Sequence, residues 1–227
     1  FSPFANEPIT DVSPPDPALA GSPVAARAQR AIVKVTGTAT SCGKVLEGTG
    51  FVFDDRRVMT NAHVVGGVDE PVVQIGGEGR RYDATVVLYD WKRDIAVLDV
   101  PDLDAPVLRF AAEDASSGDS AIVAGFPENG AYDVRAARLR GRITANGPDI
   151  YHRGTVRRDV YSLFATVRQG NSGGPLLTPE GEVYGVIFAK SLDDAETGYA
   201  LTVDEIREDI ARGRSAAQEV DSDKCAL

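Results

Sequence analysis

The chain has 227 residues, 43% of them hydrophobic, which suits one large β domain or two small ones that share an interface. Its 34 acidic and 24 basic residues give a net charge of −10, which argues against nucleic acid as a partner because phosphate binding needs basic patches. No apolar run approaches the roughly 20 residues of a membrane helix. Because the chain opens on Phe1 rather than Met, we expect a fragment or a processed form, with any signal or membrane anchor upstream.

The first segment, residues 1–21, contains five prolines and three acidic residues and lacks basic ones. This composition predicts an extended tether that packs poorly. Ser22 and Pro23 then match an N-cap followed by a proline at the first helical position. The alanine-rich stretch from Val24 to Arg30 predicts a short helix there.

From Ala31 onward the pattern changes to short β-like runs separated by turn signals. Many short strands at roughly even spacing are typical of barrels or a sandwich, and no long helical pattern alternates with them. We expect residues 115–119 to divide two series of strands. The first series is 32–35, 50–53, 72–75, 84–88 and 95–100, and the second is 120–124, 137–143, 161–167, 175–177, 183–188 and 199–203.

The end of the chain is the clearly helical part. Thr202 and Glu205 match a capping box, which predicts a helix and tail over residues 204–227. An apolar face and an i,i+4 ion pair support the helix, namely Val203, Ile206 and Ile210, with Glu208 and Arg212.

The two cysteines, Cys42 and Cys225, lie far apart in the sequence and lack metal-ligand spacing. A disulfide between them is the preferred interpretation and would indicate an oxidising compartment outside the cytoplasm, while two buried free thiols are the alternative. The acidic loop 192–196 lacks the spacing of an EF-hand, so we interpret it as a solvated loop rather than a cation site. Neither a metal nor another cofactor is predicted.

A glycine-rich stretch, Gln-Gly-Asn-Ser-Gly-Gly-Pro-Leu-Leu at 169–177, places Ser172 among glycines ahead of a short strand. One interpretation is a tight polar turn. The other is a nucleophile beside converging backbone N–H groups, which would form an oxyanion hole. This second interpretation requires a base elsewhere in the chain.

Two histidines are available as that base. His63 follows an apolar strand end in the stretch 60–65, where a satisfied, half-buried side chain is the alternative interpretation. His152 lies in a polar loop and is interpreted as a surface residue. His63 is therefore the candidate base.

A serine base also needs an acid that orients its imidazole. Asp94 is the best candidate because it enters an apolar strand, where a carboxylate is costly to bury unless it is hydrogen-bonded. Asp90 and Asp99 are the alternatives. The order His63, Asp94, Ser172 is that of chymotrypsin-like folds, whereas the G-x-S-x-G elbow of α/β-hydrolases needs a histidine after the serine.

Three motifs, at 60–65, 94–98 and 170–175, together resemble the trypsin-like serine proteases of the bacterial HtrA-like branch. Within that branch the chain is similar to the acid-resistance serine proteases of actinobacteria. The second likeness rests on Cys42 and on the stretches 44–52, 147–151 and 193–198. It covers roughly residues 22–225.

This resemblance implies an all-β, chymotrypsin-like fold of two six-stranded barrels, one in residues 22–115 and one in 116–203, with a C-terminal helix. It also implies a disulfide between Cys42 and Cys225, an extracytoplasmic location with a membrane anchor upstream, and a role in acid resistance or envelope stress. The expected partners are protein or peptide substrates, and the isolated domain is expected to be monomeric.

The resemblance further implies that Ser172 attacks the scissile carbonyl, that His63 is the general base and that Asp94 orients it. Backbone N–H groups of Gly170 and Ser172 would form the oxyanion hole, with Asn171 as a further contributor. A catalytically inert protease-like module that holds peptides and an esterase are the rival functions.

The residue six positions before the nucleophile of this fold forms the floor of the pocket for the residue before the scissile bond, and here it is Thr166. Because Thr166 has no charge to meet a cation, we expect small or medium apolar residues before the scissile bond. The walls of the pocket are expected to come from Val186, Ile187, Phe188, Ala189 and Lys190.

Overall fold

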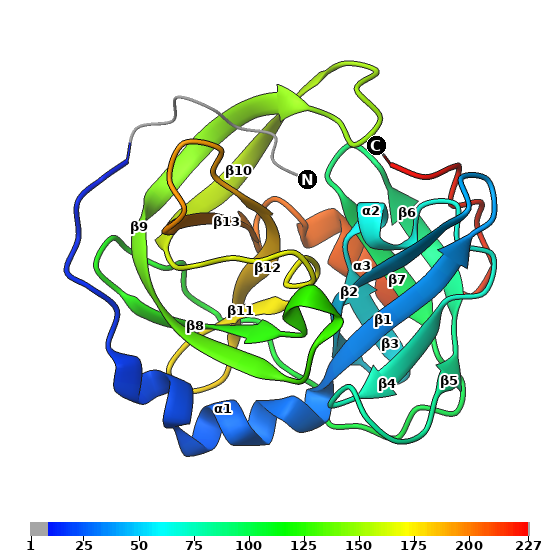
Figure 1. Ribbon diagram of the computed structural model, residues 1–227, viewed down its shortest axis with the longest axis horizontal. Coiled ribbons are helices and arrows are strands. Elements are labelled where there is room, and N and C mark those ends of the chain that lie inside the picture. The colour runs from blue at the N-terminus through cyan, green and yellow to red at the C-terminus, as the bar shows by residue number, and fades with distance from the viewer. Residues whose placement is uncertain (1–8, 227) are drawn as a thin grey trace.

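The computed structural model describes residues 9–226, most of which belong to two β units (Figure 1). Within these residues, seven strands of the N-terminal half form one curled sheet in the order β5-β4-β1-β2-β3-β7-β6. Its strands are β1 (Ile32–Ala39), β2 (Lys44–Asp54), β3 (Arg57–Thr60), β4 (Val72–Ile75), β5 (Tyr82–Asp83), β6 (Thr85–Asp90) and β7 (Ile95–Asp99). Every pairing in this sheet is antiparallel.

Six strands of the C-terminal half, within the same described residues, close a barrel in the order β10-β13-β12-β11-β8-β9. They are β8 (Ser120–Gly125), β9 (Asp133–Pro148), β10 (Thr155–Phe164), β11 (Pro175–Leu177), β12 (Val183–Lys190) and β13 (Thr197–Thr202). The predicted all-β, chymotrypsin-like class is confirmed. The first sheet has seven strands rather than six because the two-residue β5 adds to the edge beside β4.

Two largely buried strands, β7 and β11, hold the segments that carry Asp94 and Ser172. β7 lies between β3 and β6, and its first four residues, from Ile95 to Leu98, are 0% exposed. Asp94 immediately precedes this strand, so its backbone is anchored by the core of the first sheet. In the same way β11, buried throughout, follows the barrel loop that carries Ser172, residues 165–174 (the serine loop).

The N-terminal segment packs along the barrel more closely than a free tether would. Residues 1–8 lie outside the described residues, but Arg140 and Arg138 of β9 donate hydrogen bonds to the carbonyls of Thr10 (2.8 Å) and Pro14 (3.1 Å). The short helices η1 (Pro17–Gly21), α1 (Pro23–Ala28) and η2 (Gln29–Ala31) then lead into β1. The Ser22 hydroxyl accepts the Ala25 N–H, which confirms the predicted N-cap.

The C-terminal helix α3 (Arg207–Ser215) begins later than the predicted capping box. The Thr202 hydroxyl does accept the Glu205 N–H (3.1 Å), but the Glu205 carboxylate accepts the N–H of Asp159 on β10 (2.8 Å). The box is therefore only half formed, and α3 starts after the turn. The expected pairing of Glu208 with Arg212 is also replaced: Glu208 lies 3.4 Å from Arg93, and Arg212 lies 3.8 Å from Asp209.

Cys42 and Cys225 are joined by a disulfide, with their Cα atoms 6.3 Å apart. The bridge connects the tail after α3 to the turn between β1 and β2. Over residues 9–226, no helix combines the length and the apolar character that a membrane crossing requires.

Asp209 is a buried carboxylate on α3, at 0% exposed, and neither of its oxygens has a hydrogen-bond partner among residues 9–226. Burial, reinforced by the charge of Asp90, raises its pKa from 3.8 to about 6. A raised pKa means that the folded chain binds this proton more tightly than the unfolded chain does. The ionised form therefore costs stability above about pH 6, and the cost disappears as the pH falls below 3.8.

We predict that Asp209→Asn raises the free energy of unfolding by about 2 to 3 kcal/mol at pH 7.5 and by much less at pH 4.5, since each pH unit of pKa displacement corresponds to about 1.4 kcal/mol. Urea denaturation of wild type and variant at both pH values measures this change in the free energy of unfolding. Glu208→Gln, on an exposed position of the same helix, is the control and should change stability by less than about 0.5 kcal/mol. A loss of stability at pH 7.5, or a gain of the same size at both pH values, would contradict the prediction.

Candidate active site

His63 and Asp94 are held together by two hydrogen bonds. His63 lies on the one-turn helix α2 (Ala62–Val65), where its backbone N–H donates to Asp94 Oδ1 (2.9 Å) and its Nδ1 lies 2.7 Å from Asp94 Oδ2. The Asp94 carboxylate is completely buried, so these bonds compensate its desolvation. With Nδ1–H donated to the carboxylate, Nε2 is left as the proton acceptor of the ring.

Asp94 adopts an unusual backbone conformation, with a φ of +67°. Non-glycine residues populate this left-handed region sparsely, so the surroundings must hold the residue there. The Asn61 side chain donates to the Asp94 carbonyl (2.7 Å), and Asp90 Oδ1 accepts the N–H groups of Lys92 and Arg93, both at 2.9 Å. The turn 90–94 is thus pinned at both ends.

The two alternative acids have other roles. Asp90 caps the turn that carries Asp94 and also lies 3.1 Å from the Arg93 guanidinium. Asp99, at the far end of β7, pairs with Arg57 of β3. Asp94 is therefore the carboxylate that the fold brings to His63.

The serine loop depends on two glycines with positive φ, Gly170 at +92° and Gly173 at +83°. A Cβ on Gly170 would collide with the Phe126 carbonyl, and one on Gly173 with the Thr49 carbonyl, so close backbone approach excludes other residues there. Thr49, on β2 of the other unit, donates through its N–H to the Ser172 carbonyl (2.9 Å) and through its hydroxyl to the Gly170 carbonyl (2.6 Å). Thr49 therefore ties the loop to the first sheet.

The backbone donors of this loop divide into two groups. Asn171 donates its N–H to the Arg168 carbonyl (3.0 Å), and its side-chain oxygen accepts the Arg168 N–H (2.9 Å). This corrects the expected place of Asn171 in the oxyanion hole, because its N–H is already used to hold the loop. Within residues 9–226, the N–H groups of Gly170 and Ser172 donate to no protein acceptor, which leaves both available to an oxyanion.

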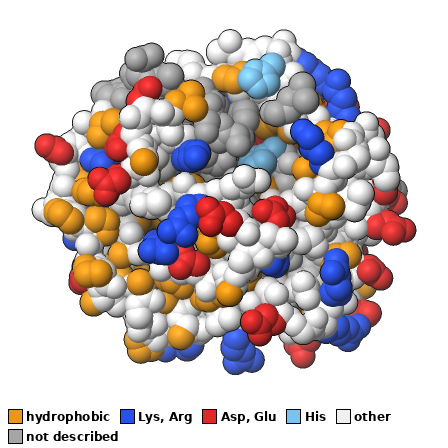
Figure 2. Space-filling view, viewed as in Figure 1, with side chains coloured by type: hydrophobic (Ala, Val, Ile, Leu, Met, Phe, Trp, Pro, Cys, Tyr) orange, Lys and Arg blue, Asp and Glu red, His pale blue; other side chains and the backbone are white. Residues whose placement is uncertain are grey.

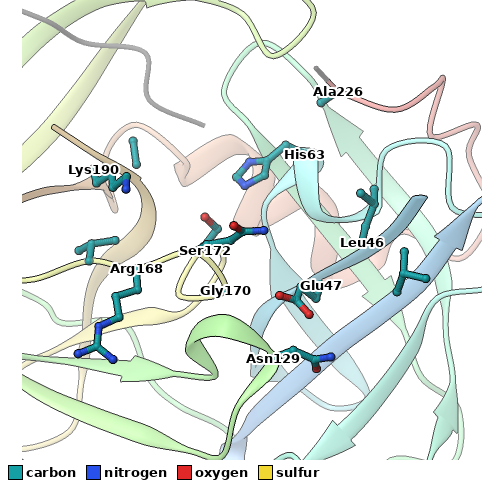
Figure 3. A pocket seen from close by; sticks show the side chains of 13 residues that line it. Leu46, Glu47, His63, Asn129, Arg168, Gly170, Ser172, Lys190 and Ala226 are labelled. Atoms are coloured by element: carbon teal, nitrogen blue, oxygen red, sulfur yellow. The ribbon is translucent and has the colours of Figure 1, made fainter. Parts of the chain in front are cut away.

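His63 and Ser172 line the same pocket, a cavity of about 780 Å³ between the two units (Figure 3). Both side chains point into it, His63 from the first unit and Ser172 from the barrel. Arg168 and Lys190 lie on one side of the pocket, and Leu46, Glu47 and Ala226 lie on the other. The geometry places a base, a hydroxyl and free backbone donors around one cavity.

The structure brings only two of the predicted pocket residues to this cavity, Ala189 and Lys190. Thr166 is exposed and does not line it, and its expected place is taken by Val167 to Gln169. The other three, Val186, Ile187 and Phe188, are 0% exposed and belong to the barrel interior. Counting six residues back from Ser172 does not identify a pocket residue here. β10 ends at Phe164, and side chains of the loop that follows do not alternate between two faces as they would in a strand.

Two structural contributors have no separate sequence signal. Asn61 was part of the histidine motif, but only the fold shows its side chain on the Asp94 carbonyl. Ala226 reaches the pocket because the disulfide at Cys225 fixes the tail beside it. A short-range pattern could not indicate either contact.

His152 is exposed in the loop between β9 and β10 and is not among the residues that line the pocket. The described part of the chain contains no group of three or more His, Cys, Asp or Glu side chains placed to hold a metal ion. On the face that carries the pocket, basic and acidic side chains are interspersed rather than gathered by sign (Figure 2).

Two β units, one with a His–Asp pair and the other with a serine beside available backbone donors, have the layout of chymotrypsin-like serine peptidases. A family profile described as a trypsin-like peptidase domain matches residues 48–186. The chain therefore belongs to the trypsin-like serine peptidase family.

Individual relatives agree with this assignment. The serine protease Rv3671c of Mycobacterium tuberculosis H37Rv is 46% identical over 226 residues, which are 99% of this chain and 56% of that protein. A probable periplasmic DegP-like serine endoprotease of Halomonas elongata is 35% identical over 69% of this chain and 33% of its own length. The chain thus spans about half or less of these relatives.

Solved structures show the same fold. The crystal structure of the M. tuberculosis Rv3671c protease described as its active form has a TM-score of 0.94 and 45% identity, covering 100% of this chain and 99% of that one. The structure described as the inactive form has a TM-score of 0.80, covering 89% and 98%. The HtrA-type protease AlgW, at 22% identity and a TM-score of 0.74 over 85% and 62%, shows the shared fold alone.

Proposed function

We propose that this chain is an endopeptidase that hydrolyses protein substrates through Ser172, His63 and Asp94. Ser172 Oγ attacks the scissile carbonyl while His63 Nε2 takes its proton, and the N–H groups of Gly170 and Ser172 stabilise the oxyanion. His63 then returns the proton to the leaving amine, and water hydrolyses the acyl-enzyme by the same route.

One observation carries this proposal: the His63 ring is fixed by Asp94 in the same cavity that Ser172 enters. A peptide-holding module would need neither a buried carboxylate on the histidine nor backbone donors left available beside a serine. Backbone donors without an acceptor cost folding free energy, and that cost serves a function when the donors bind an oxyanion.

The decisive experiment is labelling with a fluorophosphonate probe, followed by mass spectrometry of the labelled peptide. Labelling confined to Ser172, and lost in Ser172→Ala, supports the proposal. Peptide binding without labelling would support the inert module instead. Turnover of an ester substrate with no turnover of the matching peptide would indicate an esterase.

We also propose that the substrates are extracytoplasmic proteins and that the chain acts in acid resistance or envelope stress. The Cys42–Cys225 disulfide supports an oxidising compartment, and several similar proteins are named as periplasmic endoproteases. Comparison of cleavage sites in the envelope proteome between wild type and Ser172→Ala tests both parts. The upstream membrane anchor, the monomeric state and the domain boundaries stay predictions of the sequence.

The side of the pocket formed by Arg168 and Lys190 carries two cations. We therefore predict that substrates with Arg or Lys before the scissile bond have a kcat/KM at least about tenfold below those with Ala, Val or Leu, since uncompensated like charges cost about 1 kcal/mol or more. A peptide library that varies this position measures the preference.

Lys190→Glu should reduce the discrimination against Arg peptides. Lys44→Glu is the matched control, because Lys44 is exposed at the start of β2 and does not line the pocket. A wild-type preference for Arg would overturn the assignment of this side of the pocket.

A further inference from the structure

Arg158 of the barrel is buried where the two units meet. It lies on β10, its side chain is 0% exposed, and its neighbour Arg157 points outward, as strand alternation requires. A guanidinium is costly to bury unless it is hydrogen-bonded. The acceptors of those hydrogen bonds therefore indicate what Arg158 stabilises.

The Arg158 guanidinium bridges the two units through backbone carbonyls. Nη2 donates to the Lys92 carbonyl at 2.6 Å, and Nη1 donates to the Pro148 carbonyl at 3.2 Å. Lys92 belongs to the first unit and lies two residues before Asp94, whereas Pro148 ends β9 of the barrel. Phe188 packs nearby, with its ring centroid 6.0 Å from the guanidinium carbon.

Carboxylates surround this buried cation. Burial lowers the pKa of the Arg158 guanidinium. Nearby negative charges raise it, and in decreasing order of effect they belong to Asp94, Glu205, Asp149 and Asp90. Arginine stays charged in proteins, so a fixed positive charge stands near the Asp94 carboxylate.

The turn that carries Asp94 needs support from outside because of its positive φ. Asn61 holds it from α2, and Asp90 holds it from within the turn. Arg158 supplies the tie from the opposite unit, which is the unit that carries Ser172.

We propose that Arg158 is a positioning residue, which fixes the Asp94 turn, and through it His63, relative to the barrel that carries Ser172. This inference rests on the function proposed above. Arg158 acts through Asp94 and is not among the residues that line the pocket.

The test is Arg158→Met, which keeps length and apolar contacts but removes the charge and the hydrogen bonds to the Lys92 and Pro148 carbonyls. We expect kcat to fall about 10²-fold with KM within about threefold, because a small misplacement of a catalytic group costs about that much in rate. The low-field proton NMR signal of the His63 Nδ1–H···Asp94 hydrogen bond should shift or broaden. Arg158→Lys, which keeps the charge but can satisfy fewer acceptors, should recover about tenfold in kcat over Arg158→Met.

Arg140→Met is the matched control. Arg140 is also buried, at 6% exposed, donates to a backbone carbonyl (Thr10, 2.8 Å) and stacks on Phe164, 4.5 Å from the ring centroid. It is not among the residues that line the pocket, so its loss should lower the Tm while leaving kcat and the NMR signal unchanged. Rates are compared per folded protein, measured by near-UV circular dichroism.

A loss of kcat in Arg158→Met no larger than in Arg140→Met, or an unchanged NMR signal, would overturn the proposal. If Arg158→Met does not fold, Arg158→Lys decides by the same two readouts, and wild-type values for both would refute it. If wild-type protein neither labels with fluorophosphonate nor cleaves peptide, the proposed function fails, and the NMR signal still judges the positioning role.

Discussion

Replacement of Ser172 or His63 by alanine is expected to lower kcat by roughly four to six orders of magnitude, because each residue acts only as part of a unit. Ser172 supplies the nucleophile, and His63, fixed by Asp94 at 2.7 Å, supplies the base. Asp94→Asn should cost somewhat less, about 10⁴-fold, through the wrong tautomer of His63. The double variant Ser172→Ala/His63→Ala should be no slower than either single variant.

The matched controls are the unused histidine and an unused carboxylate. His152→Ala should leave kcat within about twofold of wild type, because surface changes away from a site are usually silent. Asp99→Asn should change stability through its lost pair with Arg57 but leave kcat unchanged. If loss of His152 slows turnover as much as loss of His63, the assignment of the base is wrong.

The three residues proposed for catalysis could be named from the sequence because each lies in a short motif and their order in the chain separates fold families. His63, Asp94 and Ser172 each carry a local signal, so no long-range information was needed to name them. Some strand positions were predictable for a similar reason, although β3 and β5 fall in none of the expected runs. Both β4 and β11 match the expected runs 72–75 and 175–177, since alternating or continuous apolar patterns report burial directly.

Contacts that join distant segments could not be predicted. Arg157 and Arg158 look alike in the sequence, and only the register of β10 decides which one is buried. Thr166 was assigned to the pocket by counting residues back from Ser172 along an irregular loop. Because Gly170 in that loop has a positive φ, the position of a residue in the sequence does not determine where its side chain points. α3 begins later than predicted because the Glu205 carboxylate accepts the N–H of Asp159, which is distant in the sequence, instead of capping the helix.

Loss of the Cys42–Cys225 disulfide is expected to be the largest single loss of stability. The bridge closes a loop with a sequence separation of 183, for which chain entropy gives a ceiling of about 5 kcal/mol. For a chain of this size, such a loss corresponds to a Tm lower by about 10 °C or more. The double variant Cys42→Ser/Cys225→Ser should therefore melt well below wild type.

Single variants separate the cross-link from local packing. Cys42 is exposed, so Cys42→Ser removes little besides the bridge, whereas Cys225 is buried beside Ala39 and Val68 and Cys225→Ser also places a hydroxyl there. Cys42→Ser alone should therefore account for most of the loss. A Tm for Cys42→Ser within about 2 °C of wild type would contradict the entropic argument.

The stability contributions of the disulfide and of the buried Asp209 carboxylate on α3 should differ in their dependence on pH. A disulfide has no proton to bind, so the stability lost in Cys42→Ser should be the same at pH 4.5 and pH 7.5. The gain from Asp209→Asn should instead be much smaller at the lower pH, because pH 4.5 lies below the folded-state pKa of about 6 and close to the ordinary value of 3.8. Urea denaturation of both variants at both pH values tests these two expectations. The stability difference from wild type should depend on pH for Asp209→Asn and should not depend on pH for Cys42→Ser.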